Sequence, residues 1–180
     1  MASQKSVEIT KLDAKPRQLV EAGSGVGKKR VFMDTVAVNT SDFDADGDIL
    51  YVAEVPSNAK ITSIRLFNDD LDSGTTSVAN VGLYNGGTKF TDGSTKYAVD
   101  ALIDEDAYAS AITTLQAANT SGVELAFEAR NINAIANFVW EDAGLASDPK
   151  VPLRIALTQT ATVAGDQAGD VSVIVEYVVE

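Results

Sequence analysis

The sequence predicts a mainly β protein, built as a β-sandwich with one helix. Two observations indicate this fold class. Apolar and polar residues alternate with a period of two over most of the chain after residue 28, and clusters of Gly, Asn and Asp separate the alternating runs. A chain of 180 residues, of which 45% are hydrophobic, is long enough for one domain with a buried core. We therefore expect residues 28–180 to form a single domain.

Residues 1–27 are expected to form an extended N-terminal arm. They show little periodicity and end in the flexible run Gly-Ser-Gly-Val-Gly at residues 23–27. Residues 1–30 contain seven Lys or Arg and three Asp or Glu, a net charge of +4, whereas the whole chain carries −12. A basic arm on an acidic body is suited to docking on an acidic protein surface, and a solvated tail is the alternative interpretation.

Alternation of apolar residues predicts the strands of the domain. The expected strand segments are residues 31–38, 49–53, 64–66, 81–83, 123–128, 153–158 and 171–179. Turn-forming clusters lie between them, at Asp46-Gly47, Asn68-Asp69-Asp70, Asn85-Gly86-Gly87, Asp92-Gly93 and Gly165-Asp166. Short strands separated by turns at this spacing are typical of an all-β sandwich.

One segment departs from the period of two and predicts a helix near residues 102–117. Three acidic residues, at 104–106, favour a helix N-terminus, and apolar residues then recur at helical spacing. The recurring residues are Ile103, Ala107, Tyr108, Ala111, Ile112 and Leu115. A shorter helical turn is expected through Phe138–Ala143, because Gly144 can end it.

The composition excludes most common enzyme classes. The chain contains no Cys and no His, which removes disulfides, cysteine nucleophiles, thiolate and imidazole metal ligands, and the base of a Ser-His-Asp triad. A hydrolase that uses carboxylates alone is the remaining enzymatic alternative, but no carboxylate pair stands out. We therefore predict no catalytic residues, no cofactor and no enzymatic activity.

Charge and hydropathy also limit the partners. A net charge of −12 opposes direct binding to nucleic acid. No run approaches the roughly 20 apolar residues needed to cross a bilayer, and the start of the chain has no apolar run of the signal-peptide kind. We expect no membrane partner and assembly in a cytoplasm.

Two local motifs are near matches to ligand-binding loops. Residues 22–29 resemble a phosphate-binding loop, but Ala22 replaces its first Gly, Lys29 replaces its Ser or Thr, and a strand is expected to follow; a linker is the preferred interpretation. Asp42–Asp48 matches the first half of a calcium loop. Ala53 stands where the closing Glu is needed and the flanks are strands, so an acidic turn is preferred and no metal ligand is predicted.

Two further features have a functional and a structural interpretation. The acidic loop Asn68–Asp72 is expected to be a surface turn. Trp140 is the only Trp, and three roles stay open for it: a sugar-stacking platform, an interface anchor, or packing in the core.

Several stretches in sequence order resemble a known class of proteins. These stretches are Asp46–Leu50 leading into Val55–Ile61, Asn68–Asp72, Thr75-Thr76, Val81–Tyr84, and Val139–Pro149 before the segment from Leu153 to Val179. Their layout is similar to that of small structural proteins of tailed-phage virions, of the head decoration or cement type. The resemblance covers roughly residues 30–180 and includes no catalytic motif.

The resemblance implies a jelly-roll-like β-sandwich that binds and stabilises a phage head from the capsid surface. The implied partners are further copies of the chain, in a homo-oligomer for which a trimer is one candidate, and the major capsid protein. Symmetry and multivalency would make weak contacts sufficient. The alternatives are a phage tail, fibre or baseplate component and, from another class, a calcium-dependent carbohydrate-binding module with its ion at Asp42–Asp48.

Overall fold

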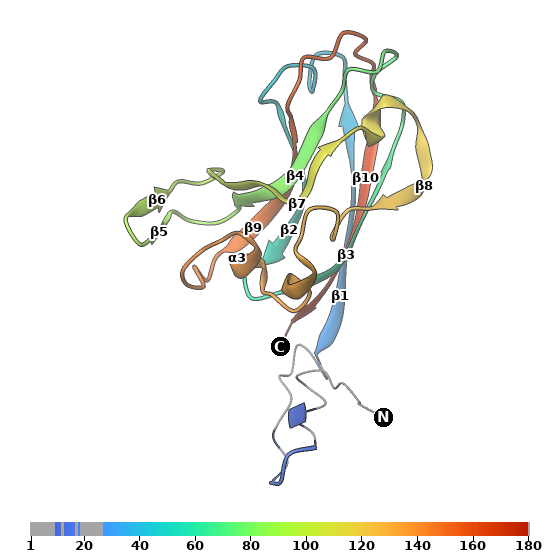
Figure 1. The fold of residues 1–180 in the computed structure, drawn as a ribbon. Coiled ribbons are helices and arrows are strands. Elements are labelled where there is room, and N and C mark those ends of the chain that lie inside the picture. Colours follow the sequence, from blue (N-terminus) through green and yellow to red (C-terminus); the bar gives the residue numbers. More distant parts are fainter. Residues whose placement is uncertain (1–9, 12, 17, 19–26, 180) are drawn as a thin grey trace.

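Two antiparallel four-stranded sheets face each other in the computed structural model, which describes residues 10, 11, 13–16, 18 and 27–179 (Figure 1). The first sheet contains, in spatial order, β1 (Lys28–Val38), β10 (Gly169–Val179), β3 (Lys60–Asn68) and β8 (Asn119–Glu124). The second contains β2 (Ile49–Pro56), β9 (Pro152–Gln159), β4 (Ala79–Asn85) and β7 (Leu102–Ile112). The prediction of a mainly β sandwich is confirmed.

The strand pairing identifies the sandwich as a jelly roll. Antiparallel pairs join β1 to β10, β2 to β9, β3 to β8 and β4 to β7. This is the pattern of one long hairpin rolled up on itself, and the pairs β3–β10 and β4–β9 then complete the two sheets. A separate short hairpin of β5 (Phe90–Asp92) and β6 (Thr95–Tyr97) lies where the long hairpin turns back.

The core lies between the sheets, where alternate residues of each strand face inward. In β10 the side chains of Val171, Val173 and Val175 are almost completely buried, and β9 contributes Leu153, Ile155 and Leu157 in the same way. Six of the seven expected strand segments coincide with strands of the two sheets. These strands are β1, β2, β3, β4, β9 and β10.

The predicted helix over residues 102–117 is wrong, because residues 102–112 form strand β7. The register between β4 and β7 is irregular: Val81 pairs with Ala109, but Leu83 pairs with Asp104. The extra residues of β7 form a bulge, which breaks the period of two. Buried residues therefore fall at Tyr108, Ile112 and Leu115, at a spacing that imitates a helix. Only the 3₁₀ turn η1 (Thr114–Gln116) is helical in this segment.

Two other predictions, for residues 123–128 and for Phe138–Ala143, had different outcomes. The strand expected over residues 123–128 is displaced, since β8 ends at Glu124 and the next residues form a turn. The short helix is confirmed as α3 (Val139–Asp142), and Gly144 follows it with φ of +67°. The 3₁₀ turn η2 (Ile132–Ala134) lies between β8 and α3.

Most of the predicted arm, residues 1–27, lies outside the described residues. Its described part contains a helical turn at Thr10, Lys11 and Asp13, where the N–H groups of Ala14 and Gln18 donate to the Lys11 carbonyl. The division into an arm and one domain over residues 28–180 stays a prediction. No helix in the described part of the chain is long and apolar enough to span a membrane.

Candidate interaction surfaces

Two of the three most exposed large apolar side chains in the described residues lie on one loop. Residues 129–137, here called the isoleucine loop, connect the turn after β8 to α3. Ile132 is 88% exposed and Ile135 is 66% exposed. The loop has a defined backbone, because Asn131 caps η2: its side chain accepts a hydrogen bond of 2.9 Å from the Asn133 N–H. Two large apolar side chains held in water on an ordered loop are typical of a contact surface.

A buried arginine fixes the isoleucine loop to the body. The Arg130 side chain is 2% exposed, and its Nη2 atom lies 3.0 Å from Oδ2 of Asp142, whose side chain is 1% exposed. The guanidinium also donates to the carbonyl oxygens of Ala134, at 2.8 Å, and Ile61, at 3.2 Å. Arg130 therefore ties the loop to β3 and α3 at once.

Burial controls the ionisation of this ion pair. Burial raises the pKa of Asp142 to about 6, and the neighbouring Arg130 charge offsets only part of that effect. The Tyr108 hydroxyl lies 3.4 Å from Asp142 Oδ2 as a long hydrogen-bond donor. The Arg130 guanidinium further lies 4.9 Å from the ring centre of Phe127, a cation–π contact.

An acidic depression beside this ion pair has no free ligand set for a metal. It is lined by Asp104, Glu141 and Asp142, among others. The Glu141 carboxylate accepts the Phe138 N–H at the start of α3, and the Asp104 carboxylate accepts the Asp106 N–H. Within residues 27–179 and the described part of the arm, no three His, Cys, Asp or Glu side chains are placed to hold a metal ion.

An aromatic layer supports the same end of the sandwich. Trp140 is half-buried, packs against the core, and stacks on Phe138 with ring centres 6.4 Å apart. Phe138 also makes a cation–π contact with the buried Lys60, whose Nζ lies 4.4 Å from the ring centre. Of the roles left open for Trp140, packing against the core is the one this geometry favours.

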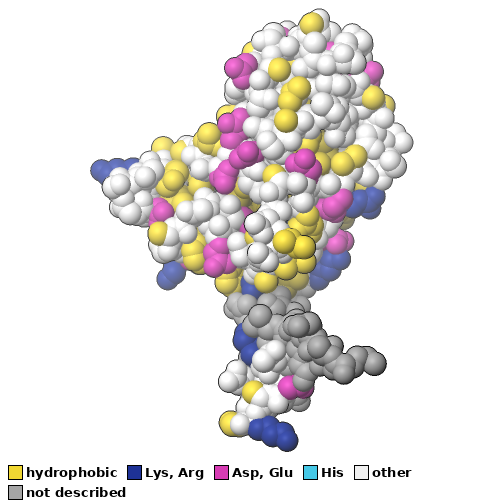
Figure 2. Space-filling view, in the orientation of Figure 1, with side chains coloured by type: hydrophobic (Ala, Val, Ile, Leu, Met, Phe, Trp, Pro, Cys, Tyr) yellow, Lys and Arg dark blue, Asp and Glu magenta, His cyan; other side chains and the backbone are white. Residues whose placement is uncertain are grey.

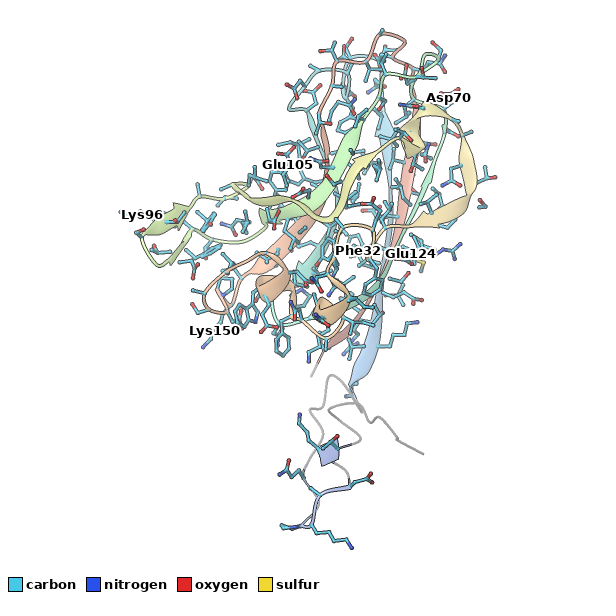
Figure 3. The ribbon with its side chains drawn as sticks, viewed as in Figure 1. Phe32, Asp70, Lys96, Glu105, Glu124 and Lys150 are labelled. Atoms are coloured by element: carbon cyan, nitrogen blue, oxygen red, sulfur yellow. The ribbon has the colours of Figure 1, made fainter. Side chains whose placement is uncertain are left out.

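The opposite end of the sandwich is acidic, and we call it the carboxylate end. It consists of the loops 39–48, 68–78 and 160–170, which contain no Lys or Arg. Their acidic residues are Asp42, Asp44, Asp46, Asp48, Asp69, Asp70, Asp72, Asp166 and Asp170. The face shown in Figure 2 carries Asp and Glu at this upper end, and Figure 3 places Asp70 there.

The carboxylates of the calcium-like loop bind their own backbone. Asp42 Oδ2 accepts hydrogen bonds from the N–H and the side-chain amide of Asn39, which lower the pKa of Asp42. Asp48 Oδ2 accepts the N–H groups of Asp44 and Ala45, at 3.1 and 2.8 Å. Gly47, with φ of +91°, provides the turn. This geometry is that of an acidic turn, and the absence of a bound metal stays a prediction.

Asp72 is not part of a surface turn, because its side chain is buried within the loop that it organises. Asp72 accepts the N–H groups of Gly74, Thr76 and Ser77 at 2.9, 2.6 and 2.7 Å. Burial alone would raise the pKa of Asp72, but these hydrogen bonds together hold it below its ordinary value. The loop 72–77 is therefore folded around one ionised carboxylate, which leaves it unsuited to hydrolytic chemistry.

A second projecting surface is the hairpin formed by residues 86–101, with Lys96 at its tip (Figure 3). Its base is held by the buried Asn85, whose amide donates to the carbonyls of Thr88 and Ala98 and accepts the Gly87 N–H. The turn cluster at Asp92-Gly93 pointed to this hairpin, but its short strands were not expected from the sequence.

The outer face of the first sheet is mixed in character. On the edge strand β1, Val31 and Met33 are 49% and 68% exposed, and Met33 pairs with Ile174 of β10. Lys29 forms an ion pair with Glu176 at the same face, with 2.6 Å between the charged atoms. Lys28 and Lys29 lie in this strand and not at the start of a helix, as a phosphate-binding loop requires; residues 22–26 of that motif lie outside the described residues.

Comparison with solved structures finds a similar fold in capsid chains of two phages. No protein-family model and no curated protein matches the sequence. A chain of the cyanophage Pam1 capsid asymmetric unit matches 93% of this chain and 97% of its own length, with a TM-score of 0.56 and 20% identity. A chain of the capsid of Ralstonia phage GP4 matches 84% of this chain and 85% of its own length, with a TM-score of 0.55 and 19% identity. At these identities the likeness establishes the fold.

Proposed function

We propose that this chain is a non-enzymatic structural protein of a phage particle, and that it decorates the capsid and stabilises the head. The observation that carries the proposal is the near end-to-end match to the capsid chain of cyanophage Pam1. The match covers 93% of this chain and 97% of that chain, so it extends over the whole sandwich and not over one motif. A chain of this size suits an accessory subunit of the shell.

The surfaces of the sandwich are consistent with this role. Its polar loops are folded around their own carboxylates, as at Asp72 and Asp48, and two highly exposed apolar side chains, Ile132 and Ile135, lie together on the isoleucine loop. A protein that binds at many equivalent sites needs only a modest contact at each one. We propose a homo-oligomer and the major capsid protein as its partners, on the outer surface of the virion.

Labelling tests the proposal directly. Antibody against the purified protein, carrying gold, is applied to particles from the source of the gene and imaged by electron microscopy. Label distributed evenly over the heads supports the proposal. Label confined to the tail favours a tail, fibre or baseplate component instead, and particles without label contradict a virion role.

A further inference from the structure

The carboxylate end and the isoleucine loop, at opposite ends of the sandwich, have opposite chemistry. The carboxylate end places Asp side chains on all of its loops and contains no Lys or Arg. Burying such an end against another protein would require the removal of water from many like charges, which is unfavourable. Exposed to solvent, the same charges keep neighbouring subunits and particles apart. The carboxylate end is therefore suited to face water.

The isoleucine loop is suited to the opposite task. Residues 131–140 contain no charged side chain, so burial of this segment removes water from no ionised group. Ile132 and Ile135 expose most of their apolar surface. Burying this surface against a partner gives a favourable free energy that is mainly entropic and needs no matching charge on the partner. Because Arg130 already fixes the loop, little conformational freedom remains to be lost on docking.

The N-terminal segment leaves the sandwich at the end that carries this loop. Lys28 pairs with Val179 and Val178 pairs with Lys60, so the start of β1 and the end of β10 lie together. Arg130 donates to Ile61, the residue after Lys60. Figure 1 shows α3 and the start of β1 in the lower part of the sandwich. The basic residues Lys28, Lys29 and Arg30 begin β1 at the same end as the apolar loop, so one partner surface can contact both.

We infer that the end with the isoleucine loop faces the capsid shell, and that Ile132 and Ile135 enter an apolar depression on the shell protein. This inference rests on the proposed function and adds the orientation of the subunit. The chemistry of the partner follows from the charges: an apolar depression for the neutral loop, with an acidic border that complements the net +4 of residues 1–30. The carboxylate end then points away from the shell.

A binding experiment with two matched variants tests the orientation. The full-length protein is titrated onto shells that lack it, and bound protein is measured after sedimentation. The test variant is Ile132→Asp with Ile135→Asp. The control is Val99→Asp with Leu102→Asp, which alters side chains that are 53% and 46% exposed near the hairpin. Unfolding midpoints of both variants are measured first to establish that each is folded.

The expected result is that the isoleucine variant binds about 100-fold more weakly, because two buried aliphatic side chains are each worth roughly tenfold or more. The hairpin control is expected to bind as the wild type does. Equal binding by the wild type and the isoleucine variant, or a loss confined to the hairpin control, would overturn the orientation. If the wild type itself fails to bind shells, the proposed function is overturned, which is a distinguishable outcome.

Discussion

Replacing Asp142 with Asn is expected to change how the stability of this protein depends on pH. The carboxylate is buried beside Arg130, and its pKa is raised to about 6 from an ordinary value of 3.8. A raised pKa means that the folded state binds the proton more tightly than the unfolded chain does. The stability provided by the protonated form is complete below about pH 4 and is lost as the pH rises toward 6.

The size of the effect follows from the two pKa values. One pKa unit corresponds to about 1.4 kcal/mol, so the ionised Asp142 costs the folded state up to about 3 kcal/mol relative to the protonated form. Asn at this position does not ionise. The free energy of unfolding of Asp142→Asn, minus that of the wild type, is therefore expected to increase by up to about 3 kcal/mol between pH 4 and pH 7.

Urea unfolding at pH 4, 5, 6 and 7 measures this difference, and the fluorescence of the single Trp, Trp140, reports on the same region. Titration of all other groups cancels in the comparison. The control is Ser147→Ala, which replaces an exposed side chain that does not ionise, so the difference is expected to stay constant with pH. A difference for Asp142→Asn that is constant would show that attraction to Arg130 balances the effect of burial, and one that decreases with pH would show that attraction outweighs it. Either result would refute the reasoning.

Four further predictions concern the loops, the sheet contact and the arm. Asp72→Ala removes a buried acceptor of three backbone N–H groups and is expected to lower the free energy of unfolding by about 2–4 kcal/mol, whereas Asp46→Ala changes it by less than about 0.5 kcal/mol; urea unfolding compares the two. Gly82→Ala places a Cβ 2.2 Å from two carbonyl oxygens of β7 and is expected to cost more than about 2 kcal/mol, seen as a lower unfolding midpoint; an unchanged midpoint contradicts the contact. Added calcium is expected to leave the melting temperature unchanged, because the carboxylates of Asp42–Asp48 already bind their own backbone; a saturable increase would reveal a site. Deletion of residues 1–27 is expected to leave the sandwich folded by circular dichroism but to weaken oligomerisation or attachment to shells, with high salt acting in the same direction; full occupancy in low and high salt would exclude a role for the arm.

The sheets were predictable because each strand leaves its own pattern in the sequence. Val171, Val173 and Val175 alternate with more polar neighbours, and turn residues mark where the strand begins. Which strands become neighbours leaves no such local pattern. The jelly-roll order therefore came from a resemblance, and the pairing in the structure confirmed it.

The failure at residues 102–117 has a specific physical cause. A bulge in β7 can form opposite Gly82, because this residue has no Cβ to meet the carbonyl oxygens of Asp104 and Glu105. The bulge spaces the buried residues of β7 as a helix would. A local pattern cannot distinguish a bulged strand from a helix when the compensating Gly lies on another strand.

The exposed isoleucine loop was not predictable from the sequence for two reasons. Apolar residues such as Ile132 and Ile135 are assigned to the core by default, and only the closed structure shows that they lie in water. The Arg130–Asp142 pair depends on α3 packing beside the isoleucine loop, so its two members carry no shared motif.

The buried ion pair and the exposed isoleucines are best understood together. A buried Arg–Asp pair is seldom the most stable solution for a protein interior, since apolar residues of similar volume often serve as well. What the pair provides here is position: one guanidinium holds carbonyl oxygens of β3 and the isoleucine loop while its charge is matched on α3. A loop fixed in this way presents the same two side chains in every copy. If the subunit occupies many equivalent sites of a symmetric shell, as proposed, that uniformity matters more than the strength of any single contact.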